Sequence, residues 1–109
     1  PNLMLISDIA VSSSRREGLP VNVMEAMATG LPLVVTNCRG NRDLVKNGKN
    51  GYLIEIDDVD SFVNKIEELY VSKNTRENFG KESRKNIEKY ELKNVLGEMK
   101  NIYSKCLYN

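Results

Sequence analysis

The feature of this 109-residue chain that most constrains its fold is a short segment, residues 21–28, that is apolar on almost every side. Pro20 stands at the first helical position, where its missing N–H would be unpaired in any case, and Gly30 follows as a left-handed stop. A helix that is apolar nearly all round is typical of one buried in an α/β layer rather than one lying on a surface. The segment therefore predicts a buried helix over residues 20–29 within an α/β fold.

One polar stripe interrupts this helix, formed by Asn22, Glu25 and Thr29, which share a face because they are three and four residues apart. An unpaired buried carboxylate is costly, so Glu25 either points into solvent or enters a cleft where a ligand supplies its hydrogen bonds. Periodicity alone favours the first, structural interpretation. Two features favour the second: Gly18 lets backbone approach a bound group closely, and the free amides at the helix start form an anion site beside Glu17.

Three short apolar runs bounded by turn residues predict strands over residues 8–13, 33–36 and 52–55. Pro32 introduces the second run, and the turn signals Asn47-Gly48 and Asn50-Gly51 precede the third. Strands that alternate with helices predict a parallel sheet with right-handed crossovers.

The remaining segments predict helices. A short helical turn is expected over residues 43–45, and Asp57 and Asp58 are expected to cap a helix with apolar positions Phe62, Ile66 and Leu69. Residues 74–77 resemble a capping box for a further helix that runs through about residue 89.

A last helix, over about residues 91–107, carries a broad apolar stripe. We expect this stripe to pack on the sheet, with contact to a partner outside this chain as the alternative. The stripe consists of Leu92, Val95, Leu96, Met99, Ile102, Tyr103 and Cys106.

Four motifs carry a resemblance to a known family: Ser14-Arg15-Arg16-Glu17-Gly18-Leu19-Pro20, Met24-Glu25-Ala26-Met27-Ala28, Gly30-Leu31-Pro32 and Asn50-Gly51. They resemble the C-terminal half of retaining GT-B glycosyltransferases of family 4, the group 1 family, and especially bacterial capsule and exopolysaccharide enzymes. The similarity runs from about residue 9 to about residue 69.

The resemblance implies a role for each part of the two-glutamate run. Glu17 would be catalytic, holding the hydroxyls of the donor sugar or supporting its developing charge, and Glu25 would accept hydrogen bonds from the ribose of the nucleotide. The turn over residues 37–43 would lie near the base or the sugar, where Arg42 and Asp43 would help to select the sugar, unless Asp43 only caps a turn. The donor-binding residues implied are Glu25, Gly18, Leu19, Pro20, Val21 and Ser14, with the backbone of residues 19–21 near the diphosphate.

The implied reaction moves a sugar from a nucleotide-diphosphate sugar, here a UDP-sugar, to an acceptor hydroxyl with retention, in surface polysaccharide biosynthesis and without a metal or another cofactor. The acceptor, a saccharide or a lipid-linked one, would be held by an N-terminal domain outside this chain. We expect a cytoplasmic enzyme, with the full-length protein peripheral at the inner membrane face.

Counted against the family, this chain supplies half of a Rossmann-like C-terminal domain, with about three parallel strands, flanking helices and a helical tail. The strands that normally hold an Arg and a Lys against the diphosphate are not in it, so we expect a fragment of a longer enzyme that is inactive alone. Arg15, Arg16 or Arg39 would then assist the phosphate, although solvated surface charges are an equally good interpretation. The strand over residues 8–13 would present an open edge for self-association.

Composition excludes several other classes. A net charge of +1, from 16 basic and 15 acidic residues, argues against a nucleic-acid footprint, and no apolar run is long enough to span a membrane. The chain has no histidine, so it offers neither a histidine base nor a histidine metal ligand. Cys38 and Cys106 fit no zinc or redox motif, which suggests a reducing compartment; we expect Cys106 to pack in the core rather than react, and Cys38 to lie in a more exposed loop.

Two alternatives to the transferase remain. A non-catalytic nucleotide-sugar-binding or assembly module would use the same half-sheet as a docking surface. A GT-B-like epimerase or phosphorylase ranks last, because histidines or a cofactor lysine motif would be expected in this half of such an enzyme.

Overall fold

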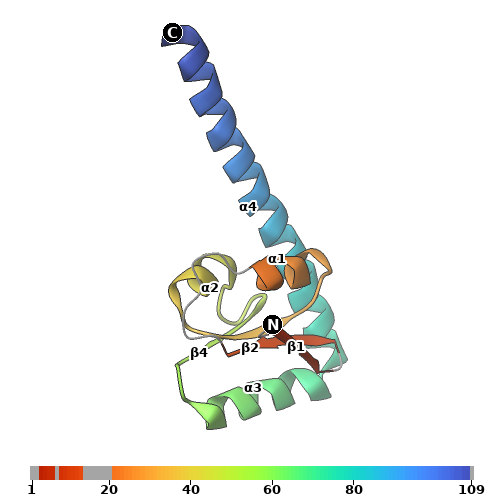
Figure 1. Ribbon diagram of the computed structural model, residues 1–109. Coiled ribbons are helices and arrows are strands. Elements are labelled where there is room, and N and C mark those ends of the chain that lie inside the picture. The colour runs from red at the N-terminus through yellow and green to blue at the C-terminus, as the bar shows by residue number, and fades with distance from the viewer. Residues whose placement is uncertain (1–2, 7, 14–20, 109) are drawn as a thin grey trace.

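A four-stranded sheet lies between helices in the computed structural model, which describes residues 3–6, 8–13 and 21–108 (Figure 1). The strands are β1 (Leu3–Ile6), β2 (Ile9–Ser12), β3 (Leu33–Thr36) and β4 (Gly51–Ile54), in the spatial order β1-β2-β3-β4. The strands β2, β3 and β4 run parallel to one another, so the three predicted parallel strands are confirmed, each within a residue of its predicted bounds.

The strand β1 was not predicted, and it changes the expected edge of the sheet. It pairs antiparallel with β2, with Ile6 opposite Ile9, so its short apolar run lies alongside β2. The prediction that residues 8–13 form an open edge is therefore wrong. The exposed side chains of the edge strand are now those of Met4 and Leu5 on β1.

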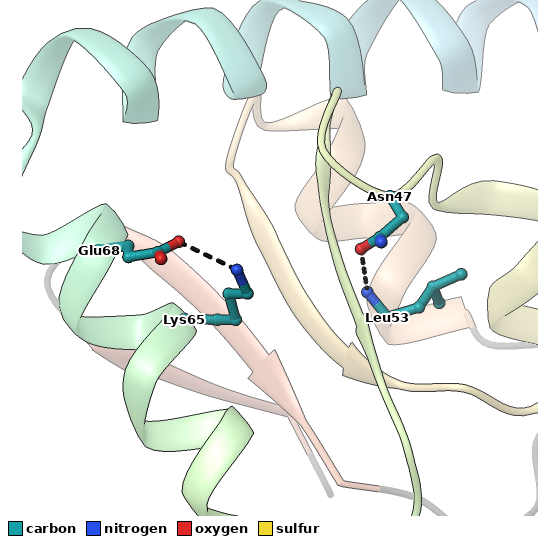
Figure 2. A network of polar contacts seen from close by, with 4 residues as sticks. All are labelled: Asn47, Leu53, Lys65 and Glu68. Carbon is teal, nitrogen blue, oxygen red and sulfur yellow. Dashed lines mark hydrogen bonds and ion pairs between the residues drawn. The ribbon is translucent and has the colours of Figure 1, made fainter.

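The other edge strand, β4, is closed by the turn that precedes it. The side chain of Asn47 accepts a hydrogen bond from the backbone N–H of Leu53 at 3.1 Å (Figure 2), and the N–H of Gly48 donates to the carbonyl of Gly51 at 2.8 Å. These contacts use backbone groups of β4 that a further strand would need.

Helices cover both faces of the sheet. The helix α1 (Val21–Ala28) and the short helix α2 (Arg39–Leu44) lie on one face, while α3 (Val59–Val71) lies on the other (Figure 1). Each face has its own apolar cluster, because successive strand residues point to opposite sides. One cluster joins β2 and β3 to α1, α2 and Ile87, and the other joins β2, β3 and β4 to α3 and Phe79. Phe62, Ile66 and Leu69 pack in the second cluster as predicted.

The end of the chain forms one long helix, α4 (Lys73–Tyr108), of 36 residues, where two helices were predicted. No proline interrupts the sequence near residue 90, and the helix therefore continues. Its start is capped by Ser72, whose hydroxyl accepts from the N–H of Thr75 at 3.2 Å, so the predicted capping box over residues 74–77 is wrong.

The distal part of α4 projects away from the rest of the molecule (Figure 1). Four residues of its apolar stripe, Leu92, Val95, Leu96 and Met99, are 50–60% exposed, so the prediction that the stripe packs on the sheet is wrong for them. The alternative, contact with something outside the chain, stays a prediction. The side chains of Ile102, Tyr103 and Cys106 lie outside the described residues.

The proximal part of α4 crosses the amino ends of the parallel strands. The backbone of Gly80 lies against the carbonyl of Gly30, just before β3, so closely that an added Cβ atom would stand 2.1 Å from that oxygen. Three residues on, the Ser83 hydroxyl donates to the carbonyl of Asn50, just before β4, at 3.2 Å. The helix thus braces the sheet at the amino ends of these strands and leaves their carboxyl ends uncovered.

Candidate functional site

The carboxyl ends of β2, β3 and β4 lie along one side of the sheet, which we call the carboxyl edge or ligand edge. Open α/β sheets bind ligands at this side. The helix α1 begins at Val21, in the connection that leaves this edge after β2 and returns to β3. The backbone amides of its first turn and any side chain near them therefore belong to the same edge.

Glu25 stands on α1 with its side chain exposed, and its carboxylate makes no hydrogen bond or ion pair with the residues that the structure describes. The other members of the polar stripe, Asn22 and Thr29, are also exposed, while Val23 and Met27 are buried. The predicted polar stripe is confirmed, but the prediction of a helix buried on nearly every other side is wrong for Ala28, which is exposed, and for Met24, which is half-buried. Of the two alternatives for Glu25, the structure places it in solvent, where a ligand can still approach.

The other predicted residues of the donor site lie outside the described residues. These are Glu17, Ser14, Gly18, Leu19 and Pro20, together with Arg15 and Arg16. Val21 begins α1, and its side chain is likewise not described. Their roles therefore stay predictions.

The turn after β3 is a helix rather than a loop, and it is held by two asparagines. Asn41 is fully buried and donates to the carbonyl of Thr36 at 3.0 Å, while Asn37 donates to a Glu55 carboxylate oxygen at 2.9 Å. Asn41 therefore does structural work at a place where contacts to the base or sugar were expected. The predicted turn over residues 43–45 lies mostly within α2, whose first residue is Arg39.

The structure also shows which side chains of residues 38–43 are exposed and which are buried. Arg39, Arg42 and Asp43 are exposed, and Asp43 lies inside α2 rather than at its start, so it is no N-cap. The residue at the N-cap is Cys38, and its side chain is only 6% exposed. The prediction of a more exposed Cys38 is wrong, because the corner between β3 and α2 packs against the core.

A cavity of about 240 Å³ opens at the carboxyl ends of the strands, on the α3 side. Asp58 caps α3 as predicted, because its carboxylate accepts from the N–H of Ser61 at 3.2 Å and from the Ser61 hydroxyl at 2.7 Å. These hydrogen bonds hold the pKa of Asp58 below its ordinary value. Asp57 is not part of the cap and has a φ of 70°. The cavity is lined by Ser13, Thr36, Ile56, Asp57, Asp58, Val59 and Phe62.

A larger cavity, of about 390 Å³, lies at the opposite edge, between the end of α1 and the middle of α4. Size alone would favour it, and its lining mixes three basic side chains with two acidic ones, namely Lys81, Arg84, Lys85, Glu77 and Glu88. It faces the carbonyl end of α1, however, and this end of the helix dipole disfavours phosphates. The carboxyl edge remains the better candidate for an anionic ligand.

A polar and aromatic cluster joins α3 to β4 and α4. The Lys65 ammonium lies 3.3 Å from a Glu68 carboxylate oxygen (Figure 2) and 4.7 Å from the centre of the Tyr52 ring, which packs edge-on against Phe79. Burial, followed by repulsion from Glu68, raises the pKa of Tyr52 above its ordinary value, and Lys65 opposes this shift. These groups fix α3 in place and lie on the side of the sheet opposite α1.

The three parallel strands with helices on both faces define an open α/β sheet of the Rossmann-like type. The family described as "Glycosyl transferases group 1" matches residues 1–86, and the chain belongs to this family. The fold is that of GT-B glycosyltransferases.

Known relatives agree with this assignment. EpsD of Bacillus subtilis (strain 168), named as a glycosyltransferase, is 39% identical over 94% of this chain and 27% of its own length. The UDP-Gal:alpha-D-GlcNAc-diphosphoundecaprenol alpha-1,3-galactosyltransferase of Escherichia coli is 48% identical over 61% of this chain and 17% of its own length. The crystal structure of the S. aureus TarM G117R mutant in complex with Fondaparinux, alpha-GlcNAc-glycerol and UDP superposes with a TM-score of 0.77, at 34% identity over 85% of this chain and 19% of that chain.

The chain spans about a quarter or less of the length of these relatives. Among the residues that the structure describes, no helix has the length and apolar character needed to cross a membrane.

Proposed function

We propose that this chain is part of the donor-binding domain of a retaining glycosyltransferase that moves a sugar from a UDP-sugar to an acceptor hydroxyl in surface polysaccharide biosynthesis. The observation that carries the proposal is the exposed Glu25 carboxylate, which has no partner among the described residues and stands on a helix that is buried on one side and starts at the ligand edge of the sheet. A carboxylate at that position accepts two hydrogen bonds from a pair of vicinal hydroxyls, which is the arrangement that a ribose offers.

The helix start supplies the complementary charge for the phosphates. The first-turn N–H groups and the positive end of the α1 dipole favour a diphosphate, both in the bound donor and as a departing group. Glu17, eight residues before Glu25 in the sequence, would stand near the sugar and stabilise the oxocarbenium-like centre that forms as the diphosphate leaves. The two acids thus have different tasks, one in binding and one in turnover.

The relatives support the choice of donor and acceptor. The name of the E. coli relative specifies a UDP-sugar donor and a diphosphoundecaprenol-linked acceptor, and the TarM structure contains UDP. By analogy, the acceptor of the whole protein would be lipid-linked or a saccharide, bound by a part outside this chain, and the enzyme would work in the cytoplasm at the inner face of the membrane.

The test is a comparison of three matched Glu→Gln variants in the full-length parent protein. Glu25→Gln should weaken UDP affinity and raise the KM for the donor, whereas Glu17→Gln should lower kcat and leave UDP affinity nearly unchanged. Glu67→Gln, at an exposed site on α3, is the control and should change neither. Unchanged UDP affinity in Glu25→Gln, measured by calorimetry, would remove the ribose assignment.

An assembly module is the second candidate, and the exposed apolar stripe of distal α4 is the observation in its favour. The same titration distinguishes the two, because a parent protein that binds no UDP at millimolar concentration would support the module and contradict the transferase.

A further inference from the structure

Four exposed basic side chains lie on the segment that joins β3 to β4, namely Arg39 and Arg42 on α2 and Lys46 and Lys49 on the turn that follows. Residues 39–49 contain only one acid, Asp43, and carry a net charge of +3. None of the four cations forms an ion pair with a residue in the described part of the chain. We call these four residues the α2 basic patch.

The patch is held on a rigid support. Arg39 and Arg42 are three residues apart on one helix and therefore neighbours on its surface. The N–H of Lys49 donates to the carbonyl of Lys46 at 2.9 Å, which closes a turn and keeps their Cα atoms within about 7 Å. The buried side chain of Asn50 fastens this turn, because it accepts from the N–H of Lys46 at 2.7 Å and donates to the carbonyl of Leu44 at 3.1 Å, both just past or within α2.

The opposite side of the domain has the opposite charge. Residues 55–68, which follow β4 and form most of α3, contain six acids and one lysine, a net charge of −5. Because α2 and α3 cover opposite faces of the sheet (Figure 1), the domain is positive on one side and negative on the other. In α4, nine basic and five acidic residues are interspersed along the helix, so its net charge of +4 is spread over its length rather than gathered on one segment.

We propose that the α2 basic patch rests on an anionic lipid bilayer, with α3 turned away from it. Clusters of four or more basic residues bind anionic leaflets, and the acidic α3 side is repelled by the same surface, so the charge separation sets the orientation as well as the attraction. The patch begins three residues after the end of β3, at the ligand edge, which is where a lipid-held acceptor would be presented. Only the link to a lipid-held acceptor rests on the proposed function; the attraction of the α2 basic patch to an anionic bilayer does not.

Vesicle co-sedimentation of the 109-residue chain tests the proposal without donor or acceptor, so a failure of UDP binding leaves its outcome unaffected. Each basic residue near an anionic leaflet contributes about a fivefold gain in partitioning, so four contribute several hundredfold at most. The chain should bind vesicles that contain phosphatidylglycerol and phosphatidylcholine. It should bind pure phosphatidylcholine at least about 25-fold more weakly, which is the effect of two such cations. The variant R39Q/R42Q/K46Q/K49Q should lose at least tenfold in binding to the anionic vesicles.

The matched control is K81Q/K85Q/K89Q/K93Q, which removes the same charge from exposed positions of α4 and should change binding by less than about threefold. The half-variants R39Q/R42Q and K46Q/K49Q, each checked for an unchanged denaturation midpoint, should show intermediate losses. Equal losses in the patch variant and the control would mean that net charge alone acts, and would overturn the proposal. The proposal would also be overturned if the chain did not bind anionic vesicles, or if it bound a heparin column but not the vesicles.

Discussion

Replacement of Gly80 by alanine tests whether α4 packs directly on the backbone at the amino edge of the sheet. The added Cβ would stand 2.1 Å from the carbonyl oxygen of Gly30, whereas contacts of real Cβ atoms essentially never fall under 3.0 Å. Since the group in the way is backbone, no side-chain rotation relieves the overlap. The helix or the turn between α1 and β3 has to withdraw by about 0.9 Å, the difference between those two distances.

The magnitude follows from two opposing effects. Overpacking of a well-packed contact costs about 1–3 kcal/mol, and the rigid backbone on both sides puts this site at the upper end. Alanine is better than glycine within a helix by about 1 kcal/mol. We therefore expect Gly80→Ala to lower the free energy of unfolding by about 2 kcal/mol, which corresponds to a fall in Tm of roughly 8–16 °C for a chain of this size.

Gly97→Ala is the matched control, because Gly97 lies in the same helix and a Cβ there meets nothing within 4 Å. Only the propensity effect applies, so this variant should be more stable than the parent by up to about 1 kcal/mol. Urea denaturation followed by circular dichroism, with the slope m checked for constancy, measures both. If Gly80→Ala were as stable as Gly97→Ala, the proposed contact between α4 and the turn would be refuted.

Three further predictions concern stability and reactivity. Asn50→Ala should cost about 2–4 kcal/mol, because it removes the partner of the part-buried N–H of Lys46 and of the buried carbonyl of Leu44. Asn47→Ala, at an exposed site, should cost under about 1 kcal/mol, and equal denaturant midpoints would contradict this. Since folding lowers the pKa of Asp58, the stabilisation that its carboxylate provides is present above the ordinary pKa of 3.8 and disappears as the pH falls through the lower folded pKa. Urea titrations at successive pH values should therefore show that the difference in stability between the parent and Asp58→Asn shrinks as the pH falls through this range. A difference that stays constant would contradict the prediction. In a Cys106→Ser background, the buried thiol of Cys38 should react with a thiol reagent far more slowly in the folded than in the urea-unfolded chain, and similar rates would show that it is accessible.

Local sequence signals predicted the elements whose boundaries are set by nearby residues. The strand β3 has its predicted bounds because Pro32 precedes its β-branched run, and α1 lies between a proline and a glycine that limit any helix. The packing positions of α3 were also predictable, since Phe62, Ile66 and Leu69 recur at helical spacing.

The errors occurred where distant contacts decide the outcome. A short apolar run such as β1 does not say which strand it pairs with, and the edge prediction for β2 failed for that reason. The apolar stripe of α4 indicates that something must cover it, but periodicity says nothing about what does. The structural roles of Asn41 and Asn50 were not predicted. In sequence, an asparagine in a turn gives the same signal whether its side chain faces solvent or forms hydrogen bonds with buried backbone groups.

The structure separates the residues that hold the sheet from those proposed to use it. Gly80, Ser83 and Asn50 act at the amino ends of the strands, whereas Glu25 and the start of α1 belong to the carboxyl edge. Substitutions at distant sites with no shared partner add nearly independently. It follows that Gly80→Ala, made in the full-length parent protein, should lower stability but leave the UDP affinity of the folded molecules unchanged. Glu25→Gln should instead weaken UDP affinity and leave stability unchanged. A loss of affinity in the folded Gly80→Ala protein would show that the brace at one edge and the site at the other are mechanically coupled through the strands.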